Sequence, residues 1–331
     1  MAPMRVLITG ASGLVGSNLT TACIQQGWQA TGTWNSVPVT VAGAQTAQLD
    51  MGDGDACRSL AREVEPDVVI HAAASVALSR LEEDTHLAEL NVLGTENTVR
   101  AAEAVGARYV MVSSDWVFSG DRPAGEKWTE DDPTDPANAY GRSKLASERI
   151  VQQAGVPWLI TRPANVYGVN RSAPTERRST EDHVWSRSSL GLRWLRLLQA
   201  GKTITAPASV YQCPTFAWDY AERTCRLIAG GELGTWHVTG PVAMHRNAYL
   251  RSLASAFDCD PRLVLDGTVA EFLRQCGDDP LLALPANTSL SDAKARSLLG
   301  LGVNPDYGHR LMREQLAQVL TAPKSPKEKL T

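Results

Sequence analysis

The chain has 331 residues, of which 43% are hydrophobic and 21% charged, as in a globular protein with one large or two ordinary domains. Its net charge of −4 excludes a global basic field that would favour nucleic acid or an anionic membrane. No apolar run is long enough to span a bilayer and no signal peptide is recognisable, so we expect a cytoplasmic protein. The six cysteines and six histidines are scattered, which predicts reduced thiols and no metal site.

The first predicted elements are a strand, a tight turn and a helix. An apolar run meets three glycines in GxxGxxG spacing, Gly10, Gly13 and Gly16, before an amphipathic segment. Glycine permits a positive φ and the close approach of a ligand, and the N-terminus of the following helix offers free N–H groups to a diphosphate. The turn therefore predicts a dinucleotide site; the alternative is a strand-to-helix turn that binds nothing.

The next two predicted strands, residues 28–34 and 45–49, bound the adenosine side of such a site. An Asp or Glu commonly binds the ribose hydroxyls at the end of the second strand, but residues 33–36 contain no acid. This favours NADP(H) over NAD(H), although no arginine takes the place of the acid. Asp50, after the third strand, could accept from the adenine amino group or serve as a turn or helix-capping residue.

The centre of the predicted sheet follows a helix at residues 56–64. Residues 68–74 form a continuous apolar run, which is typical of a parallel strand covered on both faces. The small residues at the end of this run leave space for a ligand, and we expect His71 to be a packed core residue. A long amphipathic helix at residues 87–105 and a further buried strand at 109–114 continue the alternation.

Three polar residues further along the chain are the predicted catalytic residues. Ser114 ends a strand, and Tyr140 and Lys144 share one face of the next helix. Because ligands bind at the carboxyl ends of parallel strands, these side chains and the glycine turn should converge, and chance would give this order in roughly a per cent or two of such chains. A carbonyl that accepts hydride needs a proton donor, so Tyr140 is the expected acid. Lys144 is expected to lower its pKa, and Ser114 to orient the carbonyl.

Strands alternating with helices predict an α/β fold, a doubly wound parallel sheet of Rossmann type, with a smaller and mostly helical C-terminal substrate domain. We expect domains at 1–168 and 169–320, with 212–240 returning to the first sheet, and a disordered tail at 321–331. The polar, Arg-rich residues 169–189 predict a mobile loop near the substrate, or a plain insertion. Later elements are expected as a strand at 156–161, helices at 190–200, 216–229, 247–257, 269–276, 292–299 and 307–320, and strands within 204–214 and 234–240.

Several phrases of the chain resemble one enzyme family. They are SSDWVFSG at 113–120, YGRSKLASE at 140–148, CPT at 213–215, GTWHVTG at 234–240 and SLSDAK at 289–294. The chain is similar to the extended short-chain dehydrogenase/reductase superfamily and most similar to its dTDP-4-dehydrorhamnose reductase group. The resemblance implies an NAD(P)H-dependent ketoreductase of deoxysugar biosynthesis, acting on a nucleotide-activated 4-keto-6-deoxysugar, and a homodimer through the helices at 87–105 and 140–151.

The resemblance also implies roles for individual residues. Ser114, Tyr140 and Lys144 would be catalytic. The predicted cofactor contacts are Gly10, Ser12, Gly13, Leu14, Val15, Gly16, Thr33, Asn35, Asp50, Met51, Ala72, Ala73, Ala74, Tyr140, Lys144 and Pro163. The predicted substrate contacts are Ser114, Asp115, Trp116, Tyr140 and Asn165.

Two departures from the reductase pattern leave alternatives open. The reductases usually carry Trp where this chain has Asn165, and residues 162–168 look more like sugar-nucleotide epimerases and dehydratases. Asp115 is followed by Trp116, so the adjacent Asp-Glu pair that dehydratases use for elimination is missing. The alternatives are an epimerase that retains NAD, and a non-catalytic regulatory subunit such as the methionine adenosyltransferase beta subunit.

Overall fold

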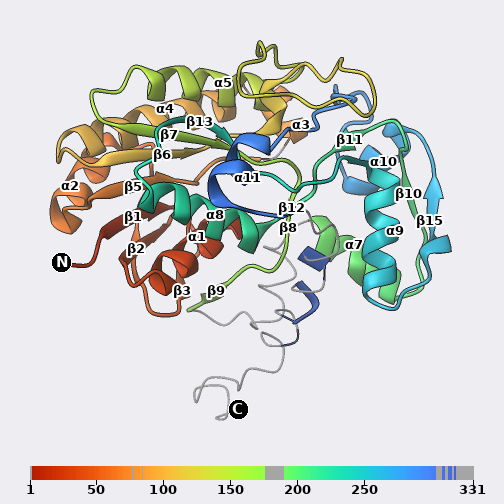
Figure 1. The fold of residues 1–331 in the computed structure, drawn as a ribbon, viewed down its shortest axis with the longest axis horizontal. Coiled ribbons are helices and arrows are strands. Elements are labelled where there is room, and N and C mark those ends of the chain that lie inside the picture. Colours follow the sequence, from red (N-terminus) through yellow and green to blue (C-terminus); the bar gives the residue numbers. More distant parts are fainter. Residues whose placement is uncertain are drawn as a thin grey trace.

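Two helical layers enclose a central sheet, and a smaller lobe packs beside them (Figure 1). The structure is a computed structural model that describes residues 2–302 except 77, 84 and 176–189, together with 308, 309, 312–314 and 317. The predicted tail, most of the predicted last helix and most of the Arg-rich segment lie outside the described residues. Among the described residues, no helix has the length and apolar character needed to cross a membrane.

The central sheet has seven strands in the order β13-β7-β6-β5-β1-β2-β4, and every neighbouring pair is parallel. Its strands are β1 (Arg5–Thr9), β2 (Gln29–Trp34), β4 (Gln45–Gln48), β5 (Val68–His71), β6 (Arg108–Val112), β7 (Trp158–Arg162) and β13 (Gly234–His237). The order reverses between β1 and β5, which is where doubly wound sheets bind ligands. The predicted fold class is confirmed.

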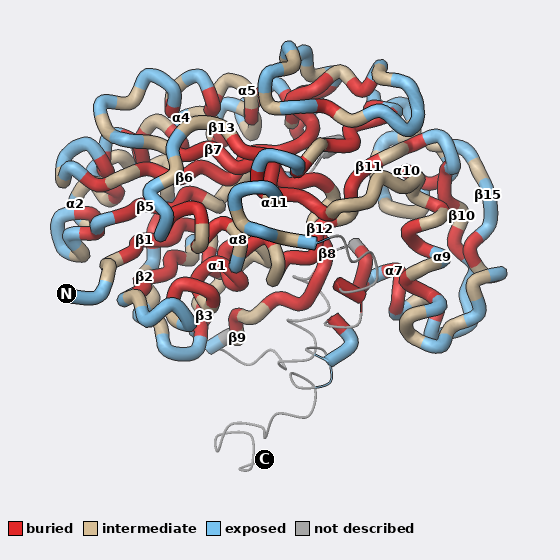
Figure 2. Tube along the Cα trace, viewed as in Figure 1, coloured by how far each residue is buried: buried red, intermediate tan, exposed pale blue. Residues whose placement is uncertain are grey.

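Helices cover both faces of the sheet because its strands are apolar on both sides. Val6 and Ile8 pack with Leu19 in one core cluster, whereas Leu7 packs with Val99 in another. Figure 2 shows the buried strands between helices with exposed outer faces. The layers are formed by α1 (Leu14–Gln25) and α8 (Ala217–Ala229) on one face, and by α2 (Gly54–Val64), α4 (Thr85–Glu103) and α5 (Ala139–Gln152) on the other.

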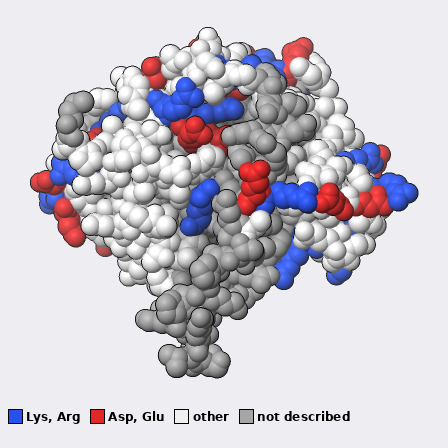
Figure 3. Space-filling view, turned by 60° about the horizontal axis from the view of Figure 1, so that its bottom comes forward, with Lys and Arg blue, Asp and Glu red and all other residues white. Residues whose placement is uncertain are grey.

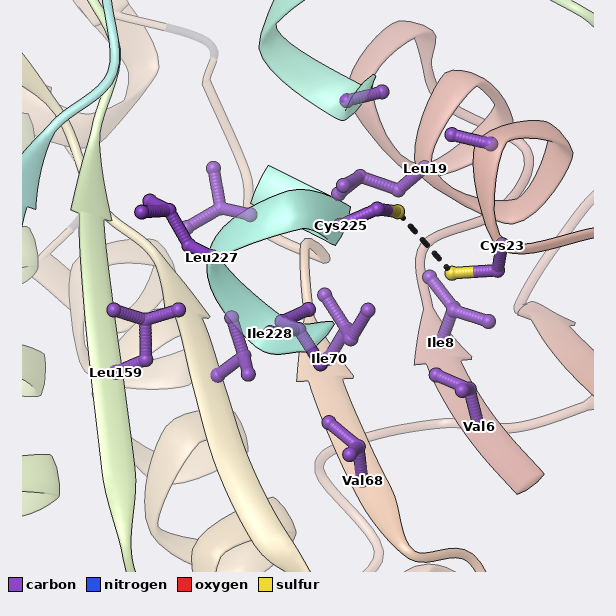
Figure 4. Packing of buried hydrophobic residues seen from close by; sticks show 14 of the residues in the cluster. Val6, Ile8, Leu19, Cys23, Val68, Ile70, Leu159, Cys225, Leu227 and Ile228 are labelled. Atoms are coloured by element: carbon purple, nitrogen blue, oxygen red, sulfur yellow. Dashed lines mark hydrogen bonds between the residues drawn. The ribbon is translucent and has the colours of Figure 1, made fainter. Parts of the chain in front are cut away.

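The first core cluster joins α1 to α8 through two thiols. The Sγ atoms of Cys23 and Cys225 lie 3.7 Å apart among aliphatic side chains of β1, β5 and β7 (Figure 4). All six cysteines are free thiols, and four of them are buried. The contact packs the helix that follows the glycine turn against a helix more than 200 residues further along the chain.

The smaller lobe has its own apolar core, in which the tilted rings of Trp194 and Phe272 lie with their centroids 5.5 Å apart. On the face in Figure 3, acidic and basic side chains of the described residues lie side by side over this lobe. It contains α7 (Leu190–Gln199), β10 (Ile204–Ala206), α9 (Arg246–Ala256), β15 (Val264–Asp266) and α10 (Val269–Cys276). Shorter elements are β3 (Val39–Val41), α3 (Leu78–Glu83), η1 (Asp115–Val117), β8 (Val166–Tyr167), β9 (Ser172–Pro174), β11 (Tyr211–Gln212), β12 (Thr215–Phe216), β14 (Met244–His245), η2 (Pro261–Leu263) and α11 (Ala293–Leu299).

One pairing differs from the sequence-based expectation. Residues 169–189 were predicted to form an irregular loop, but β9 pairs antiparallel with β3 within this region. Neither strand shows a long alternating pattern, and β9 contains a proline, so no periodicity indicates the ribbon. The ribbon lies next to the glycine turn, as the contacts below show.

Candidate active site

The glycine turn at residues 10–16 is shaped by contacts that only glycine permits. Gly10 has φ +75°, and a Cβ atom there would lie 2.8 Å from the Cα atom of Ala73. A Cβ atom at Gly16 would lie 2.2 Å from the carbonyl oxygen of Gly10. Gly13 is the N-cap of α1 and offers no side-chain hydrogen bond to the first turn of the helix. The free N–H groups of this helix start therefore remain available to an anion.

The predicted nicotinamide and diphosphate contacts meet at this turn. The Ala73 amide donates to Thr9 Oγ1 at 3.3 Å, so the 72–74 segment after β5 lies directly against the end of β1. His71, just before it, is buried and shares a hydrogen bond of 2.8 Å with Thr9 through Nδ1. Burial, with a smaller contribution from the charge of Lys144, lowers the pKa of His71 to about 3, so this residue is the neutral core histidine that was predicted.

The predicted adenosine contacts lie at the ends of β2 and β4. The Ala11 amide donates to the Thr33 carbonyl at 2.8 Å, which places the end of β2 beside the glycine turn. The Asp50 carboxylate accepts from the Gly52 amide at 2.9 Å, and Met51 packs against Gly94. Asp50 is thus a turn residue here, whereas Asp53 caps α2. Asn35 is exposed next to these residues.

A segment that sequence reasoning did not assign to the cofactor side crosses the glycine turn. Asn170 Nδ2 donates to the Ser12 carbonyl at 3.0 Å, and Asn18 Nδ2 donates to the Val169 carbonyl at 3.0 Å. The Arg171 amide donates to Ser17 Oγ at 3.1 Å. We call residues 169–175 the strap. Polar residues after the Tyr167-Gly168 pair were the only sequence signal for it.

The predicted catalytic residues lie at the carboxyl end of β6. Ser114 is the N-cap of η1, and its Oγ accepts from the Trp116 amide at 3.2 Å. Lys144 is buried on α5 and donates from Nζ to the Val112 carbonyl at 3.0 Å. Tyr140 is half-buried and meets the Trp116 ring edge-on, with centroids 5.8 Å apart. We call Ser114, Asp115, Tyr140 and Lys144 the catalytic edge.

The electrostatics of Tyr140 differ from the expectation. Burial and then the charge of Asp115 raise its pKa above the ordinary value, while a hydrogen bond with Ser114 acts in the opposite direction. Burial lowers the pKa of Lys144 to about 8, against the opposing charge of Glu148. The expected lowering of the Tyr140 pKa by Lys144 is therefore not what the structure gives, because burial dominates both groups.

Asp115 is the centre of a buried polar cluster. Its Oδ1 accepts from Ser114 Oγ at 3.0 Å, and its Oδ2 accepts from Thr288 Oγ1 at 2.5 Å. Gln212 Nε2 donates to the same Oδ2 at 3.2 Å. Burial raises the pKa of Asp115 to about 6, although these hydrogen bonds oppose the shift. Sequence reasoning missed Gln212 and Thr288, because nothing local places them near residue 115.

A buried ion pair lies next to the catalytic edge. Arg162 donates from Nε and Nη2 to the two carboxylate oxygens of Glu148, at 2.8 and 2.7 Å, and their side chains are 5% and 1% exposed. Ser113 Oγ also donates to Glu148. The pair therefore joins β7 to α5 one helical turn beyond Lys144, and Ser113 adds the residue after β6.

The remaining predicted contacts flank the catalytic edge. The Asp115 amide donates to the Pro163 carbonyl at 3.0 Å, so Pro163 holds the start of η1. Asn165 has φ +41°, a left-handed conformation that is uncommon for a residue other than glycine. Its carbonyl accepts from the Thr215 amide at 3.3 Å. Among the residues that the structure describes, no group of His, Cys, Asp and Glu side chains could hold a metal ion.

Comparison with known proteins adds independent findings. The sequence matches the family described as the RmlD substrate binding domain over residues 4–305. It is 27% identical to methionine adenosyltransferase 2 subunit beta of Rattus norvegicus over 307 residues, 90% of this chain and 83% of that protein. It is 30% identical to dTDP-4-dehydrorhamnose reductase of Streptomyces griseus over 268 residues, 78% of each chain. The dTDP-4-dehydrorhamnose reductase of Bacillus anthracis, solved in complex with NADP, superimposes with a TM-score of 0.76 at 23% identity, covering 95% of this chain and 100% of that one.

Proposed function

The chain belongs to the RmlD substrate binding domain family, and from that premise we propose that it is an NAD(P)H-dependent reductase of a keto group on a nucleotide-activated 4-keto-6-deoxysugar. The match confirms the assignment to the extended short-chain dehydrogenase/reductase superfamily, a superfamily of NAD(P)-dependent enzymes. The observation that carries the activity is the placement of Ser114, Tyr140 and Lys144 around the end of one strand.

The glycine turn fits a dinucleotide. A Cβ atom at Gly10 or Gly16 would collide with the chain's own backbone, so both glycines are needed for the tight turn, and the start of α1 offers uncapped N–H groups. Residues 10–16 would hold the diphosphate, and residues 72–74 would lie beside the nicotinamide arm. A bound nicotinamide cofactor supplies the hydride. We propose NADPH as the preferred form, because the exposed end of β2 carries no acid to repel a 2′-phosphate.

The pKa values suit reduction. Burial keeps the Tyr140 phenol protonated at neutral pH, so Tyr140 is a proton donor to the oxygen of the reduced carbonyl. Ser114 orients that oxygen. Lys144 is fixed beside the end of β6 by its hydrogen bond to the Val112 carbonyl. Asp115, Trp116 and Asn165 would contact the sugar. This assignment is supported by their position around η1 and after β7.

The test is oxidation of NADPH or NADH on addition of a dTDP-4-keto-6-deoxyhexose, followed at 340 nm. We expect turnover with at least one such sugar and a large loss of kcat when Tyr140 is replaced by Phe. If no cofactor oxidation is detected with any of several such sugars, although cofactor binding is shown separately, the substrate assignment is overturned. Purified protein that already carries NAD and does not consume NADPH would indicate the epimerase alternative.

A regulatory subunit is the second candidate, because the methionine adenosyltransferase relative aligns with 90% of this chain. A binding subunit has no need of a buried lysine beside a tyrosine and a serine, which favours the enzyme. Copurification with an enzyme partner, whose activity is the same with wild-type protein and with the Tyr140→Phe variant, would favour the subunit. We also propose a homodimer through α4 and α5, which light scattering tests directly.

A further inference from the structure

We infer that Arg246 and Gln212 are positioning residues that act on Ser114 through Asp115. This inference rests on the proposed function, in which Ser114 orients the substrate carbonyl. Arg246 opens α9 in the smaller lobe, and Gln212 ends β11, which pairs with β14 just before α9. Both residues therefore come from outside the strand and helix that carry the catalytic edge.

Arg246 is a half-buried cation that forms no ion pair with a described carboxylate. Its Nη2 donates to Gln212 Oε1, and its guanidinium carbon lies 5.0 Å from the centroid of the Phe272 ring. Its Nε is buried and has no hydrogen-bond partner, and no described acidic side chain lies within ion-pair distance. Burial lowers the pKa of Arg246, while Cys276, Tyr249 and then Asp115 act in the opposite direction. Asp115 is one of the groups that offset this charge, and Gln212 links the two side chains by hydrogen bonds.

The direction of each hydrogen bond follows from donor chemistry. Arginine can only donate, so the Gln212 carbonyl oxygen must face Arg246 and its NH2 group must face Asp115. Thr288 donates to the same carboxylate oxygen, Oδ2. Two donors therefore occupy Oδ2, and Oδ1 is the oxygen that remains to carry a proton.

This arrangement matters for Ser114. In the structure the Ser114 hydroxyl donates to Asp115 Oδ1, while its oxygen accepts from the Trp116 amide and also shares a hydrogen bond with Tyr140. Its single proton is thus not free for a substrate carbonyl. When Asp115 is protonated on Oδ1, it can donate to Ser114 Oγ, and the Ser114 proton turns to the substrate oxygen. Arg246 and Gln212 thereby determine which carboxyl oxygen can supply that hydrogen bond.

Asp115 also faces other titratable groups, which the test must take into account. They are Tyr140 of α5 and Cys213 between β11 and β12, and Asp115 raises the pKa of both. Neither is altered by substitution at Arg246 or Gln212. A shift of the Asp115 titration in those variants therefore reports the link from the smaller lobe.

The decisive measurement is the titration of the Asp115 carboxyl by 13C NMR in the full chain, assigned with Asp115→Asn. Loss of the charge in Arg246→Met, or of the donor in Gln212→Met, should raise the Asp115 pKa by about one unit. Arg251→Met is the matched control, because Arg251 lies on the same helix, is half-exposed and, within the described part of the chain, makes its polar contacts with Val264 and Asp266. Arg246→Lys should restore most of the wild-type value.

Turnover gives the second readout. In Arg246→Met the alkaline limb of kcat/KM should move upward with the NMR value, so kcat/KM at a pH above the wild-type limb should rise by up to about tenfold, with KM for the cofactor unchanged. An Asp115 titration that is the same in wild type, Arg246→Met and Gln212→Met would overturn the relay. Shifted titrations without any shift of the kinetic limb would overturn its action on Ser114. Absence of turnover in the wild type would instead reject the proposed function, and the NMR result would still decide the arrangement of the three side chains.

Discussion

The glycine turn and the catalytic edge lie on one sheet but are built in opposite ways. The turn is made by backbone: a Cβ atom at Gly10 or Gly16 would collide with the neighbouring main chain, and the strap binds the turn through the Ser12 carbonyl. The catalytic edge is made by buried side chains that reach Asp115 from residues 212 and 288. Backbone shape tolerates few substitutions, whereas a side-chain cluster sets protonation states. The two ends should therefore fail in different ways.

The largest effect is expected at the catalytic edge. Replacing Tyr140 by Phe removes the proposed proton donor while keeping the ring that meets Trp116. We expect kcat for ketosugar reduction to fall about 10²–10⁴-fold, with cofactor affinity unchanged. Steady-state NADPH oxidation and fluorescence titration measure the two quantities. Tyr109→Phe, which removes a buried hydroxyl bonded to Thr98, is the control and should keep its kcat.

The next largest effect is expected on the free energy of unfolding, from the buried ion pair next to the catalytic edge. Arg162→Met leaves the buried Glu148 carboxylate without its partner and should cost about 3–5 kcal/mol in free energy of unfolding. Urea denaturation measures this cost. Arg149→Met, at an exposed position of the same helix as Glu148, should be nearly neutral. Adding Glu148→Gln to Arg162→Met should recover part of the loss; equal stability of Arg162→Met and Arg149→Met would show that the pair is unimportant.

The glycine turn should respond through cofactor binding. Gly10→Ala adds a Cβ atom 2.8 Å from the Ala73 backbone at φ +75°, and should cost about 2 kcal/mol of stability and at least about tenfold in NADPH affinity. Gly27→Ala is the matched control, because Gly27 has φ +76° but open space around its Cβ position. Its cost should be about 1 kcal/mol, with unchanged NADPH affinity. Equal affinity losses in both variants would mean that the close approach is irrelevant.

Replacing Lys144 should have a smaller effect, and it should increase the folding stability rather than decrease it. Its pKa falls from 10.5 to about 8 on folding, so its burial costs stability at pH values below 8, and this cost disappears as the pH rises towards 10.5. Lys144→Met should thus lose activity yet gain about 1–2 kcal/mol of stability at pH 7, with no gain near pH 10.5. Thermal unfolding at both pH values measures this. Exposed Lys202→Met should change neither value.

The smallest effect is expected at the adenosine end. Asn35→Asp places an exposed carboxylate where the proposed 2′-phosphate would lie, and should lower the NADPH to NADH preference about five- to tenfold. Ratios of kcat/KM for the two cofactors measure it. Asn35→Gln keeps the site neutral and should leave the ratio near the wild-type value. An unchanged ratio in Asn35→Asp would remove the reason for proposing NADPH.

This difference between the two ends also explains what the sequence could predict. The turn, the central strands and the Tyr140–Lys144 pair are local patterns, so their places were correct to within a few residues. The strap pairing of β9 with β3 and the approach of Gln212 and Thr288 to Asp115 depend on contacts across more than 90 residues. The pKa of Tyr140 was predicted in the wrong direction, since spacing reveals a nearby lysine but not the burial that outweighs it.

The strap has a consequence for protein engineering. The chain runs from Asn165, a proposed sugar contact, to Asn170, which holds the Ser12 carbonyl of the glycine turn, without an intervening helix. A loop exchange meant to change the accepted sugar would therefore also replace the strap, which contacts the glycine turn of the proposed nucleotide site. The two specificities are thus inherited as one segment, and a recombination boundary should be placed before residue 165 or after β9.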